Sequence, residues 1–382
     1  MNRRAFLAAP IAAALAAPPQ IRLDSDGMLL LNGRRTFVLG LYQLPKGSNA
    51  WRRAADAGFH FVHAPFAAAQ LDQARAHGLH TWATLGSLRK PEDDARIRQL
   101  LAQWKDRPEI LFWETEDEPS FVWNKPREFR VAPEIIRKTY ALIKSLDPQR
   151  PVYLNHSPTN LVSTLARYNP GGDLIATDVY PVIPPGIRPQ YALWPDGQQG
   201  DLLNTTISQV GPYVDKMRQV AGPSRGVFMV LQGFSWEMLR DKDRDSKMIR
   251  YPTAAEVRFM AFQAIVHGAT GLVWWGLHTT PPESGLWDSI AATARELTAL
   301  APALAARAAT TRVDIEYHDA GHSLDRGIET IVKPTTANGS LLIAVNADKN
   351  PVDATLRLGT WKQRHSFAPF GVSYWNLGVQ AR

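Results

Sequence analysis

Short apolar runs alternate with amphipathic stretches along most of this chain, and no other feature constrains its fold as strongly. The apolar runs have the length of β-strands, and the stretches between them have helical periodicity. Strands that alternate with helices form a parallel sheet. Eight such units within roughly 270 residues predict an α/β fold, the (β/α)8 TIM barrel. The eight predicted strands are residues 37–42, 59–65, 80–85, 110–118, 151–156, 173–180, 226–232 and 271–277.

A doubly wound open sheet is the structural alternative to the barrel. That fold commonly carries a glycine-rich phosphate loop after its first strand, and none follows residues 37–42 here.

Shorter strands are expected on both sides of the barrel repeat. Residues 28–31 and 36–39 flank Asn32-Gly33, which favours a type I′ hairpin. After Ala309, short strand-like runs and the turn signal Asn338-Gly339 predict a C-terminal antiparallel β-sandwich. We expect the barrel, with its hairpin, at 18–309 and the sandwich, as an accessory domain that covers apolar barrel surface, at 310–382. The predicted sandwich strands are 311–317, 327–333, 340–346, 354–358 and 372–377.

The N-terminus has the pattern of an export signal. Arg3 and Arg4 precede Phe6-Leu7 and a short Ala-rich run, as in twin-arginine signals. The run is too short and too weakly apolar to span a membrane. We expect a signal peptide at 1–17, a periplasmic or secreted protein, and no membrane anchor after cleavage. A disordered N-terminus is the alternative.

Composition excludes several kinds of chemistry. The chain has no cysteine, which rules out thiol catalysis, Cys-ligated zinc and iron–sulfur sites. Its net charge of +7 comes from scattered Lys and Arg, so we expect no nucleic-acid partner. No His, Asp and Glu cluster has metal-ligand spacing, and we expect neither a metal nor another cofactor. The oligomeric state stays open.

Carboxylates gather at the end of the fourth predicted strand. The run 112–119 is aromatic at its start, acidic at its end and stopped by Pro119. Hydrolysis of a glycosidic bond needs a carboxylic acid beside the leaving oxygen, and barrel active sites lie at the C-terminal strand ends. Glu118 is therefore the candidate acid. A merely solvated strand end is the alternative.

Aromatic and polar side chains dominate the other predicted strand ends. Aromatic rings stack on the apolar face of a pyranose, while amide, imidazole and carboxylate groups bond its hydroxyls. The combination favours a carbohydrate cleft over an ordinary core. The candidate sugar contacts are His63, Trp113, Asp117, His156, Tyr180, Gln232, Trp236, Trp274 and Trp275.

The segment Trp113-Glu114-x-x-Asp117-Glu118-Pro119 resembles the fourth-strand signature of clan-A glycoside hydrolases. The resemblance implies that Glu118 is the general acid/base. Val62-His63-Ala64-Pro65, Tyr180 and Trp274-Trp275 stand where that clan often places substrate contacts on strands two, six and eight. The hairpin and the sandwich also resemble segments common in the clan.

Strand seven departs from that family pattern. Clan-A enzymes carry a nucleophilic Glu at its end, and Gln232 stands there instead. Asp117 likewise replaces the usual Asn before the acid, which puts the contact to the sugar 2-hydroxyl in doubt. Asp178, at the end of strand six, is the candidate second carboxylate, although it could equally cap the following loop. Glu116, Asp117 and Glu237 are weaker alternatives.

Two further polar residues have competing interpretations. Glu114 lies deeper than Glu118 on the same strand and is expected to bond within the barrel, with His63 as a possible partner. His156 could bond a sugar hydroxyl, carry a proton or be structural.

These observations predict an exported glycoside hydrolase that acts on an oligosaccharide or a glycoside. Glu118 would protonate the leaving oxygen, Asp178 would activate water or attack the anomeric carbon, and Gln232 would hold a hydroxyl or the water. The alternatives are a non-catalytic carbohydrate-binding protein and a carbohydrate lyase with Glu118 or His156 as base. The sugar, the linkage and the stereochemistry stay open.

Overall fold

The computed structural model describes residues 20–122, 125, 128–184, 206–318, 326–335 and 339–378. The predicted signal peptide at 1–17 lies outside these residues. Within them, no helix has both the length and the apolar character needed to cross a membrane.

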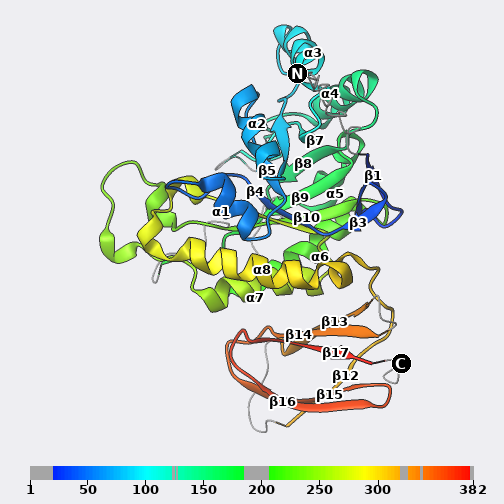
Figure 1. The fold of residues 1–382 in the computed structure, drawn as a ribbon, viewed down its shortest axis with the longest axis vertical. Coiled ribbons are helices and arrows are strands. Elements are labelled where there is room, and N and C mark those ends of the chain that lie inside the picture. Colours follow the sequence, from blue (N-terminus) through cyan, green and yellow to red (C-terminus); the bar gives the residue numbers. More distant parts are fainter. Residues whose placement is uncertain are drawn as a thin grey trace, which may run out of the picture.

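Eight parallel strands close into a barrel, which confirms the predicted fold class (Figure 1). Each strand lies within its predicted run. Pairing of the last strand with the first, Gly271 opposite Val38, closes the ring. In chain order the strands are β4 (Val38–Leu41), β5 (Phe61–His63), β6 (His80–Thr84), β7 (Ile110–Glu114), β8 (Val152–His156), β9 (Leu174–Asp178), β10 (Gly226–Gln232) and β11 (Gly271–Trp275).

Helices surround this barrel and begin and end where local chemistry favours it. Thr253 and Glu256 form a reciprocal capping box at the start of α7, and Gly222 ends α6 with a positive φ of 73°. The helices are α1 (Ala50–Asp56), α2 (Ala68–Ala76), α3 (Glu92–Trp104), α4 (Pro133–Leu146), α5 (Val162–Ala166), α6 (Val210–Ala221), α7 (Ala254–Val266) and α8 (Leu286–Ala305). Short 3-10 turns are η1 (Asn169–Gly171), η2 (Ile207–Gln209), η3 (Trp236–Leu239), η4 (Ser246–Met248), η5 (Leu277–Thr279) and η6 (Pro282–Ser284).

Alternation along the strands separates two cores. Phe61, Phe112 and Phe228 belong to a buried cluster that fills the barrel interior. Their neighbours in sequence point outward and pack beneath the helices. Trp113 and Trp274 are among these outward residues. The alternation therefore decides which strand-end residues can reach the mouth of the barrel.

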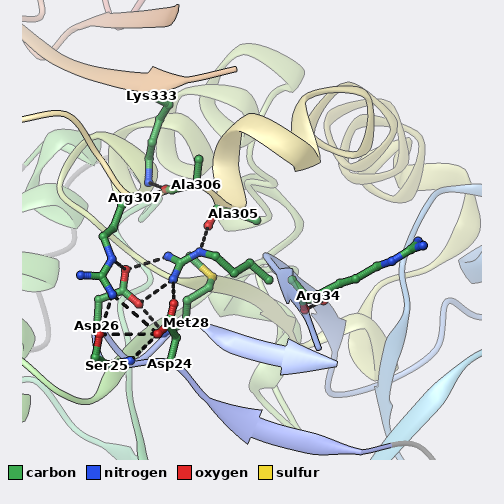
Figure 2. A network of polar contacts seen from close by, with 11 residues as sticks. Asp24, Ser25, Asp26, Met28, Arg34, Ala305, Ala306, Arg307 and Lys333 are labelled. Carbon is green, nitrogen blue, oxygen red and sulfur yellow. Dashed lines mark hydrogen bonds and ion pairs between the residues drawn. The ribbon is translucent and has the colours of Figure 1, made fainter. Parts of the chain in front are cut away.

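A small antiparallel sheet precedes the barrel and consists of β1 (Ile21–Leu23), β2 (Leu29–Leu31) and β3 (Arg34–Thr36). Asn32 and Gly33 both have positive φ, 51° and 76°, as a type I′ turn requires, so the predicted hairpin is confirmed. Its second strand starts directly after the turn and ends at Thr36, earlier than predicted. Arg35 ties the sheet to the end of α8 by donating to the Ala305 carbonyl, 2.7 Å away (Figure 2).

The C-terminal strands form two three-stranded antiparallel sheets with a shared apolar core, as a sandwich requires. The change of architecture falls between Ala305 and Asp314. Residues 361–367 form a strand that the sequence analysis missed, because most of its residues are polar and exposed. Of the predicted turn Asn338-Gly339, Asn338 lies outside the described residues. The sheets are β12 (Asp314–Tyr317), β15 (Val352–Leu358) and β16 (Trp361–Phe367), and β13 (Ile328–Pro334), β14 (Ser340–Asn346) and β17 (Val372–Leu377).

The sheet β13-β14-β17 faces α7 and α8, which lie between it and the barrel (Figure 1). Phe259 and Phe262 of α7 contact Phe370 and Tyr374 of the sandwich, with ring centroids 5.2 and 6.0 Å apart. The sandwich therefore covers apolar helix surface, as expected.

Candidate active site

The C-terminal ends of the barrel strands surround a cavity of about 250 Å³. Two kinds of side chain line it, namely carboxyl and amide groups, and aromatic rings. The described lining residues are Tyr42, Asp117, Glu118, Phe121, Asn155, Asp178, Tyr180, Val230, Phe234, Trp236, Leu239 and Trp275.

Glu118 lies in the loop after β7, and its backbone is held in an uncommon conformation. Its φ of 45° lies in the left-handed region, which residues other than glycine seldom adopt. Its N–H donates to the Asn155 carbonyl at the end of β8, 3.1 Å away. Strain of this kind persists where surrounding contacts enforce it, and functional sites are common places for it.

The carboxyl groups of Glu118 and Asp178 are in direct hydrogen-bonding contact. Burial, followed by the Asp178 charge, raises the pKa of Glu118 well above its usual range. Burial and the neighbouring Asp117 raise the pKa of Asp178 to about 7. Two adjacent buried carboxyl groups resist ionising together, so the pair holds one shared proton near neutral pH. The two predicted catalytic residues therefore lie together in the cavity.

Asn155 connects this pair to Asp117. Its side-chain nitrogen donates to Asp117 Oδ1 at 2.9 Å and to Asp178 Oδ1 at 3.1 Å. The sequence analysis missed Asn155. Its position could have indicated it, because it lies two residues after the inward-facing Tyr153 and therefore on the same face of the fifth strand.

Glu114 lies below the cavity and bonds within the barrel, as the sequence analysis expected. Its carboxylate accepts from Tyr42 at 2.8 Å, Thr84 at 2.8 Å and the Trp82 indole at 3.2 Å. Burial and the nearby Asp117 raise the pKa of Glu114 to about 7. His63 Nε2 lies 3.8 Å from Glu114 Oε2, and burial lowers the pKa of His63 to about 4. His63 thus borders Glu114 rather than the cavity.

The aromatic wall is a set of contacting rings. Tyr180 stacks on Trp275 with ring centroids 5.6 Å apart and an interplanar angle of 24°. Phe234 contacts Tyr180 edge-on at 4.9 Å, and the Trp236 indole donates to the Tyr180 carbonyl at 3.0 Å. Three of these four rings were predicted sugar contacts. Phe234 was not, because nothing in its sequence position separated it from core phenylalanines.

Gln232 is fully buried and lies outside the described cavity lining. Its Oε1 accepts from the Val182 N–H at 2.9 Å. Its Nε2 donates to the carbonyls of Val182 at 2.9 Å and Phe234 at 3.1 Å. Both donors of the Gln232 amide are therefore used by backbone carbonyls, and the buried side chain does not reach the cavity as the predicted substrate contact requires.

Three other predicted sugar contacts also lie away from the cavity. The Trp113 indole donates to Asp147 Oδ2 at 2.9 Å on the outer face of the barrel. Trp274 packs edge-on against Phe59 beneath the helices. His156 is fully buried, and burial lowers its pKa to about 3. Strand alternation explains all three positions, because each is next to an inward-facing residue.

No group of three or more His, Cys, Asp or Glu side chains in the described residues has an arrangement suited to a metal ion. The described lining of the cavity offers carboxyl groups, an amide and aromatic faces.

Comparisons with known proteins give no family for this chain. No family model matches the sequence, and no curated protein matches it. The solved structures with some similarity to it include glycosidases. An FMN-binding β-glucuronidase from Facaelibacterium prausnitzii L2-6 is 15% identical, with a TM-score of 0.47 over 92% of this chain and 58% of that one. A Parabacteroides merdae β-glucuronidase is 14% identical, with a TM-score of 0.46 over 95% of this chain and 47% of that one.

A β-galactosidase from the psychrophilic Marinomonas ef1 is 12% identical, with a TM-score of 0.47 over 69% of this chain and 60% of that one. In all three comparisons this chain spans less than two thirds of the other protein's length. At these identities and TM-scores the likenesses carry no argument about function, and activity must be argued from the site.

Proposed function

We propose that this protein is a glycoside hydrolase whose catalytic groups are Glu118 and Asp178. The observation that carries the proposal is the pair of neighbouring buried carboxyl groups in a cavity that aromatic rings also line. Carboxyl groups that keep a proton at neutral pH can act as general acids, and aromatic rings bind the apolar face of a sugar. Both requirements of glycoside hydrolysis are met within one cavity.

In the proposed reaction, the protonated member of the pair donates its proton to the glycosidic oxygen as the bond to the anomeric carbon breaks. The ionised member accepts a proton from the water whose oxygen bonds to that carbon. Glu118 is the preferred donor because the pKa of its carboxyl is raised by Asp178 as well as by burial. Asn155 donates to Asp178 and also to Asp117, and is a positioning residue.

The stereochemistry of the reaction tests the role of Asp178. Direct attack of water on the anomeric carbon inverts its configuration, whereas attack by Asp178 as nucleophile followed by water retains it. The anomer released first, followed by NMR, distinguishes inversion from retention.

A non-catalytic carbohydrate-binding protein is the second candidate. It is favoured by Gln232, whose amide replaces the strand-seven carboxylate of related folds and bonds only to backbone. A lyase with His156 as base fits less well, because that ring is fully buried outside the cavity lining.

A screen of chromogenic glycosides and polysaccharides, followed by substitution, tests the proposal. Glu118→Gln should lower kcat by at least ~10²-fold with little change in substrate affinity. Glu116→Gln is the matched control, because this carboxylate bonds to Ser87, 2.6 Å away, and does not line the cavity. Full activity of Glu118→Gln would exclude the mechanism. Sugar binding without turnover of any glycoside would favour the binding protein.

A further inference from the structure

A second cavity, of about 480 Å³, lies at the opposite end of the barrel from the candidate active site. Its walls come from the β1–β2 turn, the end of α6, the loops before β10 and β11, the chain after α8, and β13. Val227 and Thr270 place it at the N-terminal ends of the strands, where the barrel meets the sandwich.

The charged residues in this second cavity are mostly cationic. Arg218, Arg225, Arg307 and Lys333 line it, against the single carboxylate of Asp26. Asp26 is already engaged: its Oδ2 lies 2.7 Å from Arg35 Nη2 and 3.5 Å from Arg307 Nε (Figure 2). Arg218, Arg225 and Lys333 therefore remain without a carboxylate within 4 Å among the residues the structure covers.

Lys333 is the most unusual of these cations, because its side chain is buried, at 6% exposure. It extends from β13 to the carbonyl of Ala306, to which its ammonium donates at 2.9 Å (Figure 2). Burial, followed by repulsion from Arg35, lowers the pKa of Lys333 to about 8. The charge of Asp26 raises this pKa only in part, and Asp26 forms no ion pair with Lys333. An ammonium has three donors, and a buried charge without a counter-charge in contact is costly, so an anion beside Lys333 would be stabilising.

Backbone contacts hold the two arginines in position. Arg218 donates to the His267 carbonyl at 3.3 Å, and Arg225 donates to the carbonyls of Gly172 and Ala221 at 3.0 and 3.2 Å. Gly268, at a φ of 92°, allows the Arg218 guanidinium to lie against it, since a Cβ there would come within 3.2 Å. Each guanidinium has five N–H donors, so both retain donors for a ligand.

We propose that this second cavity binds a ligand carrying an oxyanion group, a phosphate, sulfate or carboxylate, held by Lys333, Arg218 and Arg225. Guanidinium and ammonium groups bind such oxygens through short, charge-assisted hydrogen bonds. Apolar side chains beside them, from Val266, Ala269 and Ile331, suit a less polar remainder of the ligand. Because the walls come from the barrel and from β13 of the sandwich, the bound ligand contacts both domains.

Thermal unfolding of the full chain tests this site without reference to any activity. Inorganic phosphate, sulfate and glucuronate are titrated at constant ionic strength with sodium chloride. We expect at least one anion to raise Tm saturably, by roughly 1–3 °C, because a ligand of the native state stabilises it. A response to glucuronate alone would identify an acidic sugar, and a response to phosphate or sulfate would identify an inorganic or esterified oxyanion.

Two variants connect the response to the cavity. Lys333→Met keeps the side-chain length without the charge, and Arg218→Gln alters an exposed side chain, so that the fold is retained. Both should abolish the saturable shift. Arg34→Gln, an exposed arginine that points away from the network, should keep it (Figure 2). An unsaturable response, or the wild-type shift in both cavity variants, would overturn the proposal.

Discussion

Gln232 and Val182 pair through both of their amide groups. The side-chain oxygen of Gln232 accepts from the backbone N–H of Val182, and its nitrogen donates to the carbonyl of the same residue, each at 2.9 Å. This reciprocal pair joins the end of β10 to the chain that leaves β9. The amide at the strand-seven position is therefore a structural element, which explains why a carboxylate does not take its place.

Gln232→Glu should destabilise the protein and should not increase activity. A carboxylate there loses the donors to Val182 and Phe234 and directs buried negative charge at two carbonyl oxygens. We expect a loss of at least about 2 kcal/mol in the free energy of unfolding. Urea titration measures it, with Gln99→Glu on the exposed face of α3 as the control. A gain in hydrolysis at unchanged stability would show that position 232 faces the substrate after all.

The shared proton of Glu118 and Asp178 predicts an unusual pH profile. Because burial raises the pKa of both carboxyl groups, and that of Asp178 to about 7, the acid form persists where ordinary carboxyl groups are ionised. We expect kcat/KM to decline on the acid side as Asp178 is protonated near pH 7, and on the alkaline side only at higher pH, where Glu118 ionises. The profile of the best substrate between about pH 4 and 10 measures this. A value of kcat/KM that already falls with rising pH at pH 6 would mean that Glu118 holds no proton in the free enzyme.

Adjacent tryptophans of β11 should have different roles. Trp275 lines the cavity and stacks on Tyr180, whereas Trp274 packs against Phe59 beneath the helices. Trp275→Ala should raise KM, or the Kd of a bound sugar, by about 3–10-fold through loss of an aromatic face. Trp274→Phe should lower Tm and leave KM unchanged. An effect of Trp274→Phe on sugar affinity equal to that of Trp275→Ala would contradict this assignment.

An ionic contact between barrel and sandwich should make stability depend on pH. His267 Nδ1 lies 2.8 Å from Asp215 of α6, and Nε2 lies 3.0 Å from Glu329 of β13. Although burial disfavours the charged ring, these carboxylates raise the pKa of His267 to about 9. Arg326, 3.9 Å from Glu329, and Gln263, at 2.9 Å, also face this contact.

Since the pKa of His267 is raised on folding, its stabilisation is complete below the unfolded value of about 6.5 and is lost as pH rises through about 9. His267→Gln should therefore cost on the order of 2 kcal/mol at pH 6 and much less above pH 9. Urea unfolding of both proteins at several pH values measures the difference. A cost that does not vary with pH would show that the ring is neutral in the native state.

Export is the remaining prediction, and it rests on the sequence alone. A fusion of residues 1–25 to a reporter that folds in the cytoplasm should reach the periplasm, because Arg3 and Arg4 match the twin-arginine pattern. Replacing both by Lys should stop it. Transport that survives the double replacement would indicate another route.

Hydrophobic patterning by itself determined the architecture. Each barrel strand lies within an apolar run, because a strand buried on both faces must be apolar along its length. The motif around Glu118 and the strand-end position of Asp178 likewise identified two residues that the fold brings together. The polar strand β16 was missed because its exposed residues carry no apolar signal.

Only the tertiary structure decided which strand-end residues face the cavity. Trp274 and Trp275 are adjacent residues of the same type. Because Val273 faces the barrel interior, Trp275 faces the same way and Trp274 faces the helices. For the same reason Asn155 lines the cavity and His156 does not, since a one-residue step reverses the face of a strand. For Gln232 even alternation was insufficient. Its side chain is occupied by Val182, a partner distant in sequence, and such a contact exists only once the strands have closed into the barrel.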